Sequence, residues 1–126
     1  MGSLLDDRVE LLAGLELGGI PLATAISLDR GIPTVFVRKH AKSYGTLKAI
    51  EGPSVSGRYV VVIEDVVTTG GAIIESVAKL RDAGAVVEKV VCAVWRGTDL
   101  APLTAAGLDL CWALAREDLD SVNCSR

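Results

Sequence analysis

The sequence predicts an α/β fold, in which an open, mainly parallel twisted sheet carries helices on both faces. Short runs of Val, Ile and Leu alternate with helical patterns, and Gly or Pro marks most transitions, which is typical of successive strand–helix units. A strand is expected over 58–65, and the unbroken run of Val and Ile from Val60 to Ile63 is what a central strand covered on both sides requires. At 126 residues the chain is long enough for one such domain.

The other elements are predicted from the positions of Gly and Pro and from the spacing of apolar residues. A helix is expected over 20–30, with Pro21 in its first turn and Gly31 as its stop; because its apolar residues lie on most faces, we expect it to be buried. Further strands are expected over 9–15, 34–37, 86–95 and 108–114, and a short helix or turn over 99–106. Residues 38–57 are polar and rich in Gly, which indicates a long loop.

The helix expected over 72–83 is amphipathic. Ile73, Val77 and Leu80 recur at the spacing of a single buried face. Glu75 and Lys79 lie four residues apart on the opposite side, which predicts an exposed ion pair.

Composition excludes several classes of function. The net charge of −3 argues against nucleic acid or an anionic membrane surface as the main partner, and no segment reaches the roughly 18 apolar residues of a membrane span. The three cysteines, Cys92, Cys111 and Cys124, have neither disulfide-framework nor zinc spacing. A reducing, cytoplasmic location fits them best.

The run "VVVIEDVVTTGG" places two acids directly before an anion-binding loop. Glu64 and Asp65 end the central strand, and ligands of open parallel sheets collect at that edge. The loop that follows brings backbone N–H groups and hydroxyls to the start of the next helix, a site suited to phosphate. Its residues are Val67, Thr68, Thr69, Gly70 and Gly71.

The common nucleotide-binding motifs are not present in this loop, which lacks both GxxxxGK[ST] and GxGxxG. Two carboxylates would repel a polyphosphate placed directly on them, but they accept hydrogen bonds from a vicinal diol nearby. A ribose 5-phosphate offers that combination. The structural alternative is that the acids cap a helix and that "TTGG" is an ordinary turn.

The same run resembles the signature of the type I phosphoribosyltransferases, which transfer the sugar of 5-phosphoribosyl 1-pyrophosphate to a nitrogen base. The resemblance implies that Glu64 and Asp65 hold the ribose hydroxyls and that the loop after them holds the 5-phosphate. Mg²⁺ is expected to share the charge of the pyrophosphate, coordinated mainly by ligand oxygens and water rather than directly by the chain.

"FVRKHAKSYGTLKAIEG", residues 36–52, is similar to the mobile lid of orotate phosphoribosyltransferases. The resemblance implies that Arg38, Lys39, Lys42 and Tyr44 contact the pyrophosphate, with Lys42 catalytic beside Asp65 and Glu64, and that residues 38–57 form a lid partly shared across a homodimer. Cations at a leaving group that accumulates charge lower the barrier, and a closing loop excludes water. The alternative is a solvated charged loop.

Two further motifs complete the resemblance. "GLELGGIPLATA" resembles the pyrophosphate loop, in which the backbone of Leu17, Gly18 and Gly19 would bind the leaving group; some relatives have Lys at the position of Gly18. Arg96 matches an arginine that grips the orotate carboxylate, a task suited to its bidentate fork. An ordinary surface ion pair is the alternative for Arg96.

The expected function is therefore transfer of the phosphoribosyl group to orotate, giving orotidine 5-monophosphate and pyrophosphate. The resemblance begins at about Val9, so we expect the family's N-terminal base-covering segment to be missing. The alternatives are a non-catalytic or truncated module that binds phosphoribosyl pyrophosphate or a nucleotide, and a phosphoribosyltransferase for another base.

Overall fold

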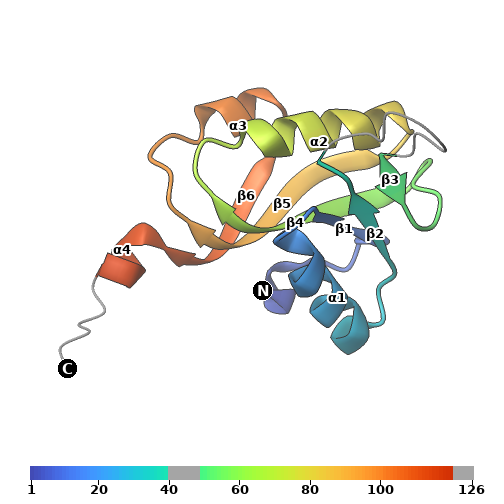
Figure 1. The fold of residues 1–126 in the computed structure, drawn as a ribbon, viewed down its shortest axis with the longest axis horizontal. Helices are drawn as coiled ribbons and strands as arrows, with labels where there is room; N and C mark the ends of the chain where they lie inside the picture. The colour runs from blue at the N-terminus through green and yellow to red at the C-terminus, as the bar shows by residue number, and fades with distance from the viewer. Residues whose placement is uncertain (40–48, 121–126) are drawn as a thin grey trace.

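A computed structural model describes residues 1–39 and 49–120 of the chain. Within these ranges six strands form one sheet in the order β3-β2-β1-β4-β5-β6 (Figure 1). All neighbouring strands are parallel except β3, which runs antiparallel to β2. The strands are β1 (Leu11–Leu15), β2 (Thr34–Val37), β3 (Ile50–Glu51), β4 (Tyr59–Val67), β5 (Val86–Trp95) and β6 (Asp109–Ala115).

Helices cover both faces of the sheet, as predicted. Figure 1 shows α1 (Gly19–Arg30) on one face, and α2 (Gly71–Asp82) with α3 (Ala101–Ala105) on the other. Gly31 ends α1 in the left-handed region, with φ of 69°, where glycine is unstrained. Two short elements escaped prediction because they span too few residues to show a period: the 3₁₀ helix η1 (Gly2–Leu4) and α4 (Arg116–Asp120).

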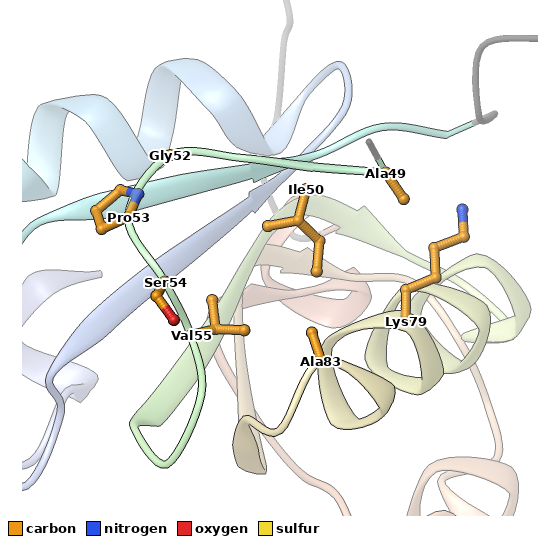
Figure 2. A pocket seen from close by; sticks show the side chains of 8 residues that line it. All are labelled: Ala49, Ile50, Gly52, Pro53, Ser54, Val55, Lys79 and Ala83. Carbon is orange, nitrogen blue, oxygen red and sulfur yellow. The ribbon is translucent and has the colours of Figure 1, made fainter. Parts of the chain in front are cut away.

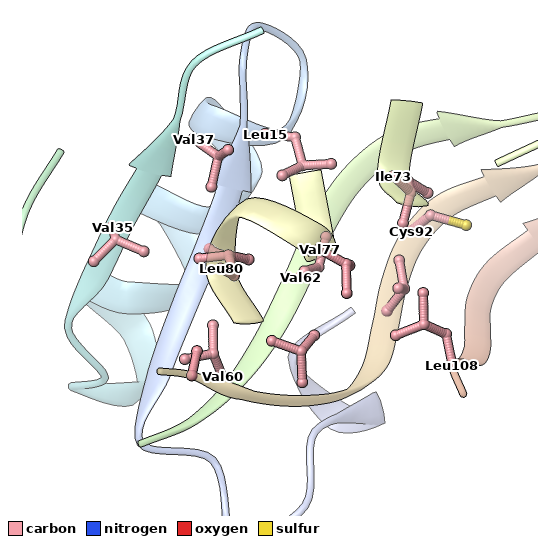
Figure 3. Close-up of a cluster of buried hydrophobic side chains, with 14 of the residues drawn as sticks. Leu15, Val35, Val37, Val60, Val62, Ile73, Val77, Leu80, Cys92 and Leu108 are labelled. Carbon is pink, nitrogen blue, oxygen red and sulfur yellow. The ribbon is translucent and has the colours of Figure 1, made fainter. Parts of the chain in front are cut away.

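The core consists of two apolar layers separated by the sheet. Along β4, Val60 and Val62 belong to the layer under α2, whereas Val61 and Ile63 belong to the layer under α1. Burial on both faces explains the continuous apolar run of this strand. Figure 3 shows the α2 layer, which includes Leu15, Val35, Val37, Ile73, Val77, Leu80, Cys92 and Leu108.

The structure corrects three of the expectations. Helix α1 is not buried all round, because Gly19, Ala23 and Ile26 are its buried residues, whereas Leu28 is 83% exposed. The long loop after β2 contains a two-residue strand, β3, that pairs with β2. A strand of two residues between Gly and polar residues is too short to give a recognisable sequence pattern.

The third correction concerns the predicted ion pair between Glu75 and Lys79. In the part of the chain that the structure describes, the two side chains form no salt bridge. Lys79 Nζ instead donates hydrogen bonds to the backbone carbonyls of Arg38 at 3.2 Å and Lys39 at 3.3 Å. The lysine therefore joins α2 to the end of β2, a contact that helical spacing alone does not predict.

Among the described residues, no helix is long and apolar enough to cross a lipid bilayer.

Candidate active site

The candidate site lies where the order of the sheet reverses. Strand β1 leads through α1 to β2 on one side, whereas its neighbour β4 leads through α2 to β5 on the other, and the two helices lie on opposite faces. Pairing between β1 and β4 ends at Gly14 and Ile63, but β4 stays paired with β5 as far as Val67. The residues after Ile63 thus face an opening at the carboxyl ends of the strands, the usual ligand position in such sheets.

Glu64 and Asp65 lie in this opening. Glu64 is half-buried, and its Oε1 accepts a hydrogen bond from the backbone N–H of Asp65 at 2.9 Å. Asp65 is exposed, and its Oδ1 accepts one from the N–H of Val66 at 2.7 Å. Each carboxylate keeps a second oxygen for a ligand.

Burial raises the pKa of Glu64 to about 7, although the N–H of Asp65 and the positive charge of Lys39 both act to lower it. Removing the carboxylate from water disfavours its charged form. Near neutral pH Glu64 therefore exists in both protonation states, so that it is able either to donate or to accept a hydrogen bond with a hydroxyl group.

The predicted phosphate loop and Glu64, the first acid of the pair, share one small cavity. A cavity of about 100 Å³ is lined by Glu64, by all five predicted loop residues from Val67 to Gly71, and by the start of α2. The N-cap of α2 is Gly70, with φ of 87°, and no side chain of the described residues caps this helix. Its first-turn N–H groups are thus available to an anion, and the acids are not helix caps.

Two glycines of the predicted pyrophosphate loop allow β1 and α1 to approach the acid pair. A Cβ built on Gly18 would overlap the Asp65 carboxylate, and one built on Gly19 would overlap the backbone carbonyl of Ile63. The loop also contains a cis peptide between Glu16 and Leu17. Any side chain at position 18 would compete with the Asp65 carboxylate for space, which gives a physical reason for glycine at this position.

Gly18→Ala is expected to displace the Asp65 carboxylate while leaving the fold intact, since the end of an exposed side chain is free to rotate away. We expect about tenfold weaker binding of phosphoribosyl pyrophosphate, the scale of one lost charge-assisted hydrogen bond, with an unchanged thermal midpoint. Calorimetric titration measures the first and differential scanning fluorimetry the second. Unchanged affinity would show that the position of Asp65 is unimportant.

The structure brings Lys39, but not Arg38, to the acid pair. Lys39 and Glu64 line a cavity of about 160 Å³ together with Leu15, Glu16, Ala72, Glu75 and Ser76. Arg38 is turned to the neighbouring strand, where its Nη2 and Nε lie 3.1 and 3.3 Å from Glu51 Oε1. Its contact with pyrophosphate stays a prediction, and the predicted site residues Lys42 and Tyr44 lie outside the described residues.

Arg96 lies beside the phosphate loop. Its backbone N–H donates to the carbonyl of Val67 at 2.9 Å, and its side chain, which forms no ion pair among the described residues, lines a cavity of about 350 Å³ with Thr68 and Thr69. Sequence reasoning missed the remaining lining residues, although they all lie within six positions after Arg96: Gly97, Thr98, Asp99 and Pro102.

A further cavity of about 340 Å³ lies away from these residues, between α2 and the segment around β3 (Figure 2). Its lining is mainly apolar, and none of the predicted site residues that the structure describes belongs to it. Lys79 stands at its rim and extends from α2 toward the side on which Ala49 lies. This cavity is therefore distinct from the candidate site.

No direct metal site is evident within residues 1–39 and 49–120, where no three His, Cys, Asp or Glu side chains cluster closely enough to hold an ion. Glu16, Glu64 and Glu75 line one cavity together with Lys39. Mg²⁺ usually keeps several waters and binds proteins through only one or two carboxylates, so an ion carried by a ligand would not need a cluster of three.

Comparison with known proteins identifies the family. The family model described as the phosphoribosyl transferase domain matches residues 5–105. The chain belongs to the phosphoribosyltransferase family. Among its curated relatives, an orotate phosphoribosyltransferase from a Nocardioides species is 50% identical over 122 residues, covering 96% of this chain and 68% of that protein. The expected resemblance to the orotate branch of the phosphoribosyltransferases is thereby confirmed.

Solved phosphoribosyltransferase structures confirm the fold. A phosphoribosyltransferase from Corynebacterium diphtheriae superposes with a TM-score of 0.80 at 39% identity, covering 94% of this chain and 70% of that one. Mycobacterium tuberculosis orotate phosphoribosyltransferase in complex with 5-phospho-alpha-D-ribosyl 1-diphosphate gives 0.76 at 34% identity, covering 90% and 67%. The chain thus spans about two thirds of the length of these relatives, and about half of some others, such as the Methanocaldococcus jannaschii enzyme at 52%.

Proposed function

We propose that this chain binds 5-phosphoribosyl 1-pyrophosphate and transfers its phosphoribosyl group to orotate, giving orotidine 5-monophosphate and pyrophosphate. The observation that carries the proposal is the shared cavity of Glu64 and the uncapped start of α2, with Asp65 next to it. Carboxylates that accept hydrogen bonds from hydroxyls lie there next to N–H groups that donate to a phosphate, as a ribose 5-phosphate requires. The names of the curated relatives support orotate as the base.

Each described part of the site has a proposed task. Glu64 and Asp65 accept hydrogen bonds from the ribose hydroxyls, and the residues from Val67 to Gly71 bind the 5-phosphate. The backbone of Leu17, Gly18 and Gly19 and the ammonium of Lys39 receive the pyrophosphate. Arg96 pairs with the orotate carboxylate through its bidentate guanidinium.

Catalysis in this proposal is mainly orientation and electrostatics. The bond from C1 of the ribose to pyrophosphate breaks, and a bond from the orotate ring nitrogen to C1 forms. Positive charge develops on the sugar close to the two carboxylates, while negative charge develops on the leaving group. Lys39 and, as a prediction from the sequence, Lys42, Arg38 and Tyr44 stabilise that negative charge.

Mg²⁺ would neutralise part of the pyrophosphate charge when it is bound. We propose that the ligand's own oxygens and waters hold the ion, with Glu64 and Asp65 contacting it through water. Glu64 is half-buried, and its carboxyl is therefore partly neutral near pH 7. Such a group is better suited to a hydrogen bond with a hydroxyl than to direct coordination of a metal ion.

A homodimer and a cytoplasmic location complete the proposal. Residues of the segment that resembles the lid would serve the site of a neighbouring subunit, so that a fully active enzyme contains at least two copies. Sedimentation velocity measures this state directly, and a monomer with full activity would contradict the shared lid.

Turnover tests the proposed reaction. Mixing the protein with orotate, phosphoribosyl pyrophosphate and Mg²⁺ is expected to cause a loss of orotate absorbance that stops when either substrate is omitted. Saturable binding of phosphoribosyl pyrophosphate without turnover of orotate or any other base would support the alternative, a non-catalytic binding module.

Two variants separate sugar binding from leaving-group chemistry. Asp65→Asn is expected to raise KM for phosphoribosyl pyrophosphate about tenfold, because it weakens a charge-assisted hydrogen bond to the ribose. Lys42→Ala is expected chiefly to lower kcat, because pyrophosphate, the proposed partner of Lys42, gains negative charge in the transition state. Steady-state kinetics measures both, and the opposite split would reverse the two assignments.

A further inference from the structure

The backbone of Lys39 is held from both sides by residues that sequence analysis gave no role in the site. Its N–H donates a hydrogen bond to Glu16 Oε1 at 3.0 Å. Its carbonyl accepts one from Lys79 Nζ at 3.3 Å, and the same ammonium donates to the carbonyl of Arg38 at 3.2 Å. One anchor comes from the loop after β1 and the other from α2, so two separate elements fix the same residue.

Both side chains bind the backbone near Lys39 although each has another environment within reach. Lys79 has Glu75 one turn away on its own helix, yet it reaches the backbone at the end of β2 instead. Glu16 is exposed, yet its carboxylate accepts the Lys39 N–H. Hydrogen bonds that involve a charged partner are about twice as strong as neutral ones, so the pair together restrains the Lys39 backbone appreciably.

The restrained backbone sets where the Lys39 side chain lies. Lys39 lines the cavity that Glu16, Glu64 and Ser76 share. In the proposed function this is the side of the acid pair from which pyrophosphate leaves. If the Lys39 backbone were not restrained, its ammonium would spend much of its time in solvent, since lysine has many rotamers and is strongly hydrated.

We propose that Glu16 and Lys79 are positioning residues that hold the Lys39 backbone so that its ammonium stays beside Glu64, where it meets the pyrophosphate of the sugar donor. The assignment of the ligand rests on the proposed function, whereas the restraint itself does not. Glu16 and Lys79 act through Lys39, and neither needs to touch the ligand.

Hydrogen exchange tests the restraint without any ligand. In the unliganded protein, the Lys39 amide is expected to exchange about tenfold faster in Lys79→Met and in Glu16→Ala than in the wild type, the scale of one hydrogen bond to a charged group. Glu16→Gln keeps a carbonyl oxygen at the same place and should restore most of the protection. Equal exchange in all four proteins would overturn the proposal.

A double-mutant cycle tests whether Lys79 acts through Lys39. Lys79→Met is expected to weaken binding of phosphoribosyl pyrophosphate about threefold to tenfold in the wild type, but by less than about twofold in the Lys39→Ala background, because coupled residues are not additive. Additive losses, or no loss from Lys79→Met in the wild type, would refute positioning. If the wild type did not bind phosphoribosyl pyrophosphate at all, only the proposed function would be contradicted. Hydrogen exchange of the Lys39 amide would then still test whether Glu16 and Lys79 restrain the Lys39 backbone.

Lys89→Met provides the matched control. Lys89 Nζ also donates to a backbone carbonyl, that of Leu4 at 2.5 Å, but it does so on η1, away from the candidate site. Its loss removes the same kind of bond with a similar effect on stability, and it should change neither Lys39 exchange nor ligand binding. If Lys89→Met has the same effects as Lys79→Met, the consequences are general destabilisation and the proposal fails.

Discussion

Gly19→Ala is expected to lower the free energy of unfolding by about 3 kcal/mol, the upper part of the usual range for overpacking. A Cβ at this position would overlap the backbone carbonyl of Ile63, and that carbonyl belongs to the central strand β4, whose neighbours on both sides restrict its movement. Relief would require α1 to move away from the sheet, which opens the layer that Ala23 and Ile26 fill. Chemical denaturation measures the loss.

Gly71→Ala is the control for this prediction. A Cβ on Gly71 meets nothing within 4 Å, and the residue begins α2, so alanine there should be neutral or stabilising by up to about 1 kcal/mol. If Gly19→Ala were as stable as Gly71→Ala, the close approach of α1 to β4 would be wrong.

Glu64→Gln is expected to stabilise the unliganded protein at pH 8 by about 1–2 kcal/mol. Burial raises the pKa of Glu64 from 4.5 to about 7, so the folded state retains a proton that the unfolded state has already released between these two values. Stability therefore falls as pH rises through this window and is lowest above pH 7. The full shift corresponds to about 3 kcal/mol, which partial exposure of the carboxylate reduces by solvent screening.

Urea denaturation at pH 4.5, 6 and 8 measures this effect as a difference between wild type and variant. The difference should be small at pH 4.5, where the carboxyl is neutral in the folded state, and should grow with pH. Glu88→Gln, which removes an exposed carboxylate of β5, should change stability by less than about 0.5 kcal/mol at every pH. A Glu64→Gln difference that is constant with pH would show that Glu64 ionises normally.

The sequence predicts most of the fold because its strongest signals are local. Val60 to Ile63 alternate between two buried layers, so an unbroken apolar run marks the centre of the sheet. The site is equally easy to recognise at the phosphate loop, since the two acids, the two threonines and the two glycines all lie within residues 64–71. These residues come together in the structure as their order along the chain indicates.

The remaining features depend on contacts between distant segments. Arg38 pairs with Glu51 only because β3 folds back on β2, and two residues are too few to predict such a strand. Lys79 binds the end of β2 rather than Glu75 because α2 passes close to it. The fit of Gly18 against Asp65 depends on the approach of the start of α1 to the end of β4, which a glycine pair in a sequence does not reveal.

The central claim is that the acid pair faces the ribose diol while the adjoining loop receives the 5-phosphate. Calorimetric comparison of ribose 5-phosphate with 2-deoxyribose 5-phosphate tests it most directly, because the two ligands differ by one hydroxyl. The wild type should bind the ribose form about tenfold more tightly, and this preference should approach one when Glu64→Gln and Asp65→Ala are combined. Equal binding of both sugars by the wild type would contradict the claim.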